Sequence, residues 1–215
     1  MEKKNKNDKE MRYMQFGNLE VRESDGEGSK VRTIAGYVTK YNKESQILRD
    51  WWGDEFIEVV AEGAFNESLE RNIIKALWNH DTNLVLGSTK NNTLRLTSDN
   101  IGLKFELDLP ENTWGNDAWE SIQRGDVDGV SFGFRVLDDK WSETEKEGKK
   151  ILKRTLLKID LYEISPTPFP AYLDSEVSCR SLEKYREKRK KEEEKRSLVK
   201  DLEKFDLQLE LFKMQ

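Results

Sequence analysis

The chain of 215 residues has room for one domain of ordinary size with appendages, and its 37% charged and 35% hydrophobic residues indicate that part of it lies outside a hydrophobic core. A formal net charge of −5 argues against a surface that binds duplex nucleic acid. The single cysteine, Cys179, excludes an intramolecular disulfide and suits a reducing cytoplasm, and we interpret it as a thiol without a catalytic role.

The N-terminal part of the chain predicts a polar segment followed by strands. Residues 1–12 are mostly charged or polar, and we expect a flexible segment with no signal peptide or membrane span. Two β-prone runs, residues 13–21 and 31–41, flank a segment rich in glycine and serine that fits a hairpin turn or a flexible loop. We interpret these runs as the first strands of a β domain.

Short strand candidates follow one another through the middle of the chain, and two helices are expected between them. The strand candidates are residues 56–60, 73–79, 84–88, 93–97, 102–109 and 130–139. The first helix is expected at residues 63–70. The second, at residues 116–125, has Asn116 as its expected N-cap and places Trp119 and Ile122 on its buried side. Many short strands in close succession favour a barrel or sandwich over βαβ units.

The motif around Ser131 predicts either a nucleophile or an ordinary surface serine. Alternation along a strand places Phe132 and Phe134 on one face, and Ser131 with Gly133 on the other. Because Gly133 has no side chain, it leaves space over the hydroxyl where a substrate backbone can approach. A serine that merely faces solvent fits the same pattern.

The chain has one histidine, His80, and it follows the strand candidate at residues 73–79. We expect this side chain to continue one face of that strand at its end. A lone imidazole there serves as a surface or core group in many proteins. It is also the side chain that takes a proton from serine near neutral pH.

A third candidate, Glu163, continues the apolar face formed by Leu157, Ile159 and Leu161, just before a run of prolines that is expected to end the strand. The hairpin that leads to it is predicted as the strand at 130–139, a charged loop at 142–149 and a returning strand at 150–163. A carboxylate on an apolar face needs a partner, which is either an imidazolium, an arginine or lysine, or water. Serine, histidine and an acidic residue together are the minimal set for acyl transfer.

The ordered motifs Leu-Trp-Asn-His-Asp, Gly-Val-Ser-Phe-Gly-Phe and Leu-Tyr-Glu-Ile-Ser-Pro-Thr-Pro-Phe-Pro resemble the prohead (capsid maturation) serine protease family of tailed bacteriophages. The resemblance spans about residues 30–180. It implies a mainly β fold with helices, a closed or partly closed β-barrel like that of the herpesvirus assemblins, at residues 13–180. It assigns Ser131 as nucleophile, His80 as general base and Glu163 as the orienting acid.

The resemblance also implies a biological setting. It predicts a viral serine endopeptidase that cleaves scaffold and/or major capsid protein, and itself, within the procapsid in the host cytoplasm. It leaves a homodimer or higher oligomer open, and we expect no nucleic-acid or membrane partner. No cofactor or metal is expected, since one histidine and one cysteine make no zinc set. A non-catalytic capsid assembly or scaffolding protein of the same fold is the alternative.

The C-terminal residues 181–215 differ in composition from the rest. They begin with a run that is almost wholly Lys, Arg and Glu, which is typical of a solvated helix or linker. Apolar residues then recur at spacings of four and three, at Leu198, Leu202, Phe205, Leu209 and Phe212. We interpret the segment as a charged, amphipathic helical tail that docks on another surface or is removed by self-processing.

Overall fold

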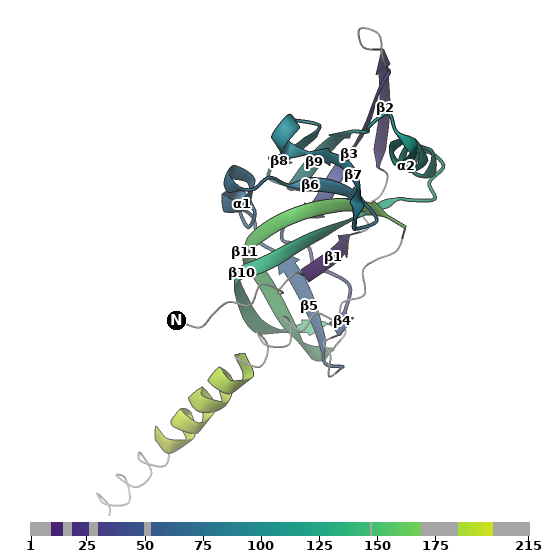
Figure 1. The fold of residues 1–215 in the computed structure, drawn as a ribbon. Coiled ribbons are helices and arrows are strands. Elements are labelled where there is room, and N and C mark those ends of the chain that lie inside the picture. Colours follow the sequence, from purple (N-terminus) through teal and green to yellow (C-terminus); the bar gives the residue numbers. More distant parts are fainter. Residues whose placement is uncertain are drawn as a thin grey trace, which may run out of the picture. The chain divides into compact units, whose positions relative to one another are not determined.

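The computed structural model describes residues 10–14, 19–25, 30–49, 53–146, 148–168 and 185–199. By its internal contacts the chain divides into two compact units, Met1–Ser175 and Glu176–Gln215. The described residues of the first unit form two β-sheets and two α-helices, whose arrangement can be followed in Figure 1.

The larger sheet has seven strands, and the long antiparallel pair β10 and β11 forms its centre. The order along its main path is β1, β10, β11, β5 and β4, while β6 lies beside β11 and β7 beside β6. The strands are β1 (Glu10–Met14), β4 (Leu48–Arg49), β5 (Glu55–Val60), β6 (Lys75–Trp78), β7 (Asp81–Ser88), β10 (Gly129–Lys146) and β11 (Lys149–Thr167).

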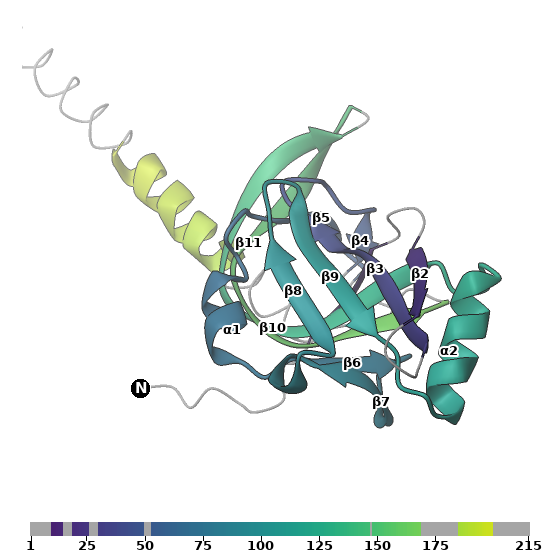
Figure 2. The ribbon, with the colours of Figure 1, turned by 90° about the horizontal axis from the view of Figure 1, so that it is seen from above.

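The smaller sheet has four antiparallel strands in the order β2, β3, β9, β8, which lie side by side in Figure 2. These strands are β2 (Glu20–Asp25), β3 (Lys30–Lys40), β8 (Leu94–Ser98) and β9 (Gly102–Asp108). The strand predicted at residues 31–41 corresponds to β3, and β2 pairs with it. The run predicted at residues 13–21 overlaps only the end of β1 and the start of β2. A short 3₁₀ helix, η1 (Thr89–Asn91), connects β7 to β8.

The hydrophobic core is formed by alternate residues of both sheets together with the inner sides of the helices. Phe132 and Phe134 project from the same face of β10 and stack with ring centroids 5.0 Å apart. Phe65, just before α1, packs its ring edge-on at 6.1 Å from that of Phe132. Burial of each such ring stabilises the fold by about 1.5–3 kcal/mol. Because these aromatic rings occupy the core, Ser131 lies on the opposite face of β10.

The two helices occur where they were expected, with one difference at a cap. They are α1 (Asn66–Arg71) and α2 (Thr113–Gln123), and Trp119 and Ile122 are buried as predicted. The N-cap of α2 is Asn112 rather than Asn116, because the Asn112 side chain accepts a hydrogen bond of 2.8 Å from the Gly115 N–H.

The prediction of a charged loop at residues 142–149 is wrong. β10 continues to Lys146 and β11 begins at Lys149, so the strands pair almost to the turn. Glu145 lies directly opposite Lys150, and such opposite charges stabilise a solvated ladder. The charges therefore belong to a strand face rather than to a loop.

The mainly β fold is confirmed. Of the closed or partly closed barrel that was expected, a closed barrel is not found among the described residues. Within the described ranges the strands form two open sheets, whose end strands are β1, β4 and β7 in the larger and β2 and β8 in the smaller. A barrel requires its first and last strands to pair. Here β4 has only two residues and β1 only five, and each pairs with one neighbour.

In the second unit, residues 185–199 form a helix with an exposed ion pair between Arg189 and Glu193, one turn apart. Leu198 is exposed. The remainder of the predicted apolar spacing, like Cys179 and residues 1–9, lies outside the described residues. Among the described helices, none has the length and hydropathy needed to cross a bilayer.

Candidate active site

His80 lies in the tight turn between β6 and β7. Trp78 pairs with Asp81, which leaves Asn79 and His80 as the two central residues, with φ angles of 52° and 62°. Positive φ at both positions is the geometry of a type I′ hairpin, and it is unfavourable for residues with a side chain. The prediction that His80 continues a strand face is therefore wrong, because the chain reverses direction at this residue.

Three hydrogen bonds from the end of β11 hold this turn. The N–H of Asn79 donates to the Pro166 carbonyl at 3.2 Å, and the N–H of His80 donates to the Ser165 hydroxyl at 3.2 Å. The Thr167 hydroxyl donates to the Asn79 side chain at 2.7 Å. β11 thus continues past Glu163 to Thr167, although the run of prolines was expected to end the strand at Glu163. Surrounding contacts of this kind are needed to maintain an unfavourable backbone conformation such as the positive φ angles of this turn.

Glu163 connects directly to the imidazole. Its Oε1 lies 2.8 Å from His80 Nδ1, and its Oε2 accepts a 2.7 Å hydrogen bond from the Ser165 hydroxyl. An ionised carboxylate only accepts hydrogen bonds, so Nδ1 donates to it, and in the neutral imidazole Nε2 then has the lone pair. Nε2 is buried and has no hydrogen-bond partner among the described residues. The ring is therefore oriented with its basic nitrogen available.

Ser131 lies on the same sheet face as these groups. It pairs directly with Ser165 across β10 and β11, and Cβ atoms of such pairs are about 4.5–5.5 Å apart. Ser165 itself contacts both Glu163 and His80. The Ser131 side chain is fully buried, and its hydroxyl donates to the backbone carbonyl of Arg12 in β1 at 2.8 Å. The three predicted residues thus lie on neighbouring positions, with the hydroxyl directed to β1.

A family model described as caudovirus prohead serine protease matches residues 17–188. The chain belongs to this family. A search of curated proteins found no match. Among solved structures, the capsid assembly protease gp21 of bacteriophage T4 is similar at 11% identity and a TM-score of 0.44, over 73% of this chain and 99% of that one.

In this member of the prohead protease family, two groups near the site were missed by sequence reasoning. Ser165 could have been found, because it lies two residues after Glu163 and so on the same strand face. β1 was not recognisable, because Glu10 and Arg12 belong to a run that reads as a polar terminus.

Glu10 and Arg12 enter a buried cluster of charges with residues of β5, β10 and β11. Arg12 Nε lies 2.6 Å from Glu58, and Arg154 lies 2.9 Å from Glu10, 3.2 Å from Glu58 and 2.7 Å from Asp139. Burial opposes the charge on Arg12 and Arg154, but the adjacent carboxylates outweigh it and hold both pKa values above the ordinary value. The two guanidinium groups therefore stay charged while β1 is in place.

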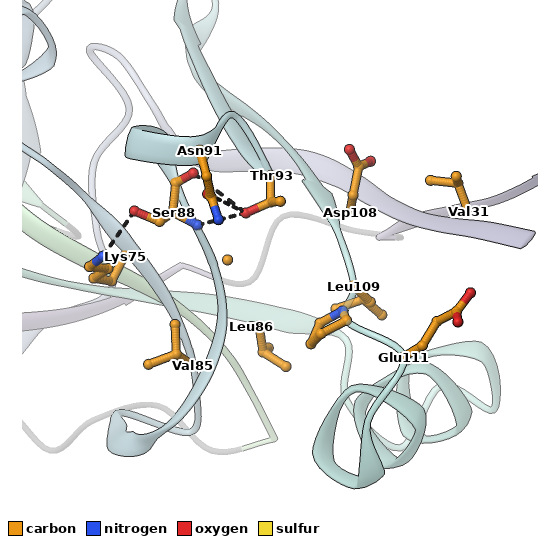
Figure 3. A pocket seen from close by; sticks show the side chains of 12 residues that line it. Val31, Lys75, Val85, Leu86, Ser88, Asn91, Thr93, Asp108, Leu109 and Glu111 are labelled. Carbon is orange, nitrogen blue, oxygen red and sulfur yellow. Dashed lines mark hydrogen bonds between the residues drawn. The ribbon is translucent and has the colours of Figure 1, made fainter. Parts of the chain in front are cut away.

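The described residues also contain a pocket of about 510 Å³, which Ser131, His80 and Glu163 do not line (Figure 3). Lys75, Asp108 and Glu111 bring charge to its wall, and Lys75 donates to the Ser88 hydroxyl at 3.0 Å. Within the described part of the chain, no group of three or more His, Cys, Asp or Glu residues is arranged to hold a metal ion.

Proposed function

We propose that this chain is a serine endopeptidase of phage head maturation, with Ser131 as nucleophile, His80 as general base and Glu163 as the orienting carboxylate. The observation that carries the proposal is the buried Nε2 of His80, which has no partner among the described residues while Nδ1 is bound by Glu163. An imidazole that a carboxylate holds in this way, on the sheet face that carries a serine, is the kind of arrangement that activates a hydroxyl.

In the proposed mechanism, His80 Nε2 takes the hydroxyl proton as Ser131 Oγ bonds to the carbonyl carbon of a peptide. Glu163 stabilises the imidazolium and keeps its orientation. The carbon–nitrogen bond then breaks, and the imidazolium returns the proton to the leaving amine. Water, deprotonated by the same imidazole, releases the acyl group and restores Ser131. Backbone N–H groups stabilise the oxyanion, commonly one of the largest contributions in such reactions.

The proposed substrates are the scaffold and/or major capsid protein, and the chain itself, inside the procapsid in the host cytoplasm. The family description supports this setting. Residues 181–215 act as a docking or self-processed segment. Deletion of this segment should leave peptide hydrolysis intact and reduce packaging of the enzyme into procapsids.

The test is incubation of the purified protein with its cognate scaffold and major capsid proteins, with new termini mapped by mass spectrometry. Wild type should produce discrete new termini. Ser131→Ala and His80→Ala should fold and produce none, and Glu163→Ala should produce them slowly. Cleavage at the wild-type rate by Ser131→Ala contradicts the proposal. Absence of cleavage by every protein, with retained binding to the capsid proteins, favours a non-catalytic assembly factor.

A further inference from the structure

Lys75 brings an uncompensated positive charge to the wall of the pocket in Figure 3. Its ammonium group is partly buried and donates to the Ser88 hydroxyl at 3.0 Å, and no carboxylate of the described residues contacts it. Lysine is seldom buried without a partner, because removing its charge from water costs free energy. The pocket thus holds a cation that has no counter-ion within the described part of the chain.

Two further hydrogen-bond donors lie on the same part of the wall. The Ser88 hydroxyl is buried and accepts from Lys75 and from the Lys90 N–H at 3.2 Å, and its own proton has no acceptor among the described residues. Asn91 accepts from the Thr93 hydroxyl through Oδ1 at 2.9 Å, which leaves its amide protons to donate. An ammonium, a hydroxyl and an amide are together donors that suit a carboxylate.

A negative charge at the other end of the pocket restricts the kind of anion that fits. Glu111 lies at the end opposite Lys75 in Figure 3, and its carboxylate has no partner among the described residues. Asp108 is also on the wall, where Arg95 pairs with it at 2.6 Å. Because like charges repel, Glu111 disfavours a polyanion such as a nucleic acid. The wall instead complements a ligand that is acidic at one end and basic at the other.

The part of the wall between these charges is apolar. It is formed by Val31, Val85, Leu86, Leu109 and Pro110. Val31 and Val85 are each more than a third exposed, so an apolar side chain that covers them removes apolar surface from water. The volume of about 510 Å³ is within the range of pockets that hold a small ligand or a few side chains.

The pocket lies at the base of the hairpin that carries His80. Lys75 is the first residue of β6 and pairs with Glu163 of β11, and β6 continues directly into the turn of His80. None of Ser131, His80 and Glu163 lines the pocket. A segment bound there leaves these three groups free and tethers the rest of the same protein beside them.

We propose that this pocket is a docking site for the scaffold and/or major capsid protein, separate from the point of cleavage. The docked segment places an acidic side chain against Lys75 and Ser88, apolar residues against the middle of the wall and a basic side chain against Glu111. The docking role rests on the proposed function. Binding of the segment itself does not require Ser131.

The first test measures binding without catalysis, by NMR titration of the full chain with synthetic peptides. The peptide acetyl-Gly-Glu-Leu-Leu-Lys-Gly-amide should shift the amide signals of Ser88 and Glu111. It should bind at least about tenfold more tightly than the same peptide with Gln in place of both Glu and Lys. Lys75→Met should remove this difference. The control Lys90→Met, at an exposed lysine that does not line the pocket, should keep it.

A change of ligand preference provides a stricter form of this test. Glu111 is exposed, so Glu111→Lys should fold. This variant should prefer a peptide with Glu at both charged positions to the Glu-Leu-Leu-Lys peptide, whereas wild type should show the reverse. Equal binding of all peptides, an unchanged preference in Glu111→Lys, or tighter binding of inorganic phosphate than of the peptides overturns the proposed site.

The second test concerns the docking role and uses the cognate scaffold and major capsid proteins as substrates. In Glu111→Lys, KM should rise at least about fivefold, and the effect should fall on KM rather than on kcat, because docking adds binding away from the reacting groups. An unchanged KM, or a loss confined to kcat, overturns the docking role. If wild type cleaves neither protein but the peptides bind as described, the proposed function fails while the binding site stands.

Discussion

Ser165→Ala removes a residue that acts on the proposed base and acid without touching a substrate. The Ser165 hydroxyl donates to Glu163 at 2.7 Å and accepts from the His80 N–H at 3.2 Å. A hydrogen bond to a charged group contributes about 1.5–3 kcal/mol, and an unsatisfied buried N–H costs about 1–3 kcal/mol. We therefore expect the free energy of unfolding to fall by a few kcal/mol. If the hydrogen bond from Ser165 to Glu163 orients the imidazole, its loss should slow the labelling of Ser131 by a fluorophosphonate about 10- to 100-fold.

The matched control for this variant is Ser68→Ala. Ser68 is also a buried serine bonded to β11, where it accepts from the Leu161 N–H at 2.7 Å, but it lies on α1 away from His80. Denaturant unfolding should show a comparable loss of stability for both variants, while fluorophosphonate labelling slows only in Ser165→Ala. Equal labelling by the two variants would refute the positioning role of Ser165.

Three further predictions concern Glu163, the buried charged cluster around Arg154, and the stability of the protein at low pH. Glu163→Gln should raise the activation free energy of peptide hydrolysis by more than it lowers the free energy of unfolding. The reason is that an amide nitrogen facing His80 forces the imidazole proton to Nε2. Peptide hydrolysis and denaturant unfolding measure the two effects. Arg154→Ala should lower the free energy of unfolding by about 3–5 kcal/mol, as it leaves buried carboxylates uncompensated, and chemical denaturation should detect this. The hydrogen bond from Arg95 holds the pKa of Asp108 below its usual value. The contribution of this ionised carboxylate to the free energy of unfolding is therefore complete above about pH 4 and is lost as the pH falls through the lowered pKa. Asp108→Asn should therefore destabilise the protein at neutral pH and little at pH 2, and equal destabilisation in thermal melts at both would contradict this.

The strands of the core were predictable because their alternation is local. Phe132 and Phe134 fix one face of β10, and this assigns Ser131 to the other face without any knowledge of the fold. The same rule placed Glu163 on the apolar face of Ile159 and Leu161, and this prediction is wrong. A register shift in the β10–β11 pair leaves Leu161 opposite the core residue Phe134 and Glu163 opposite Gly133, on the sheet face of Ser131. The local pattern could not predict whether the strands close into a barrel, since this depends on which distant strands pair.

The turn at His80 and the strand β1 illustrate two other limits. Asn79 and His80 adopt positive φ because contacts from β11, more than 80 residues away, outweigh the local preference. Glu10 and Arg12 look like a solvated terminus in the sequence. Their burial becomes evident only once Glu58 and Arg154 are placed beside them.

The central claim, that His80 activates Ser131, is tested most directly by locating the adduct of a fluorophosphonate by peptide mass mapping. The account predicts one adduct, on Ser131, in wild type, and at least about a hundredfold slower labelling in a folded His80→Ala variant. Labelling of Ser131 at the same rate in both proteins, or an adduct on another serine alone, would contradict it.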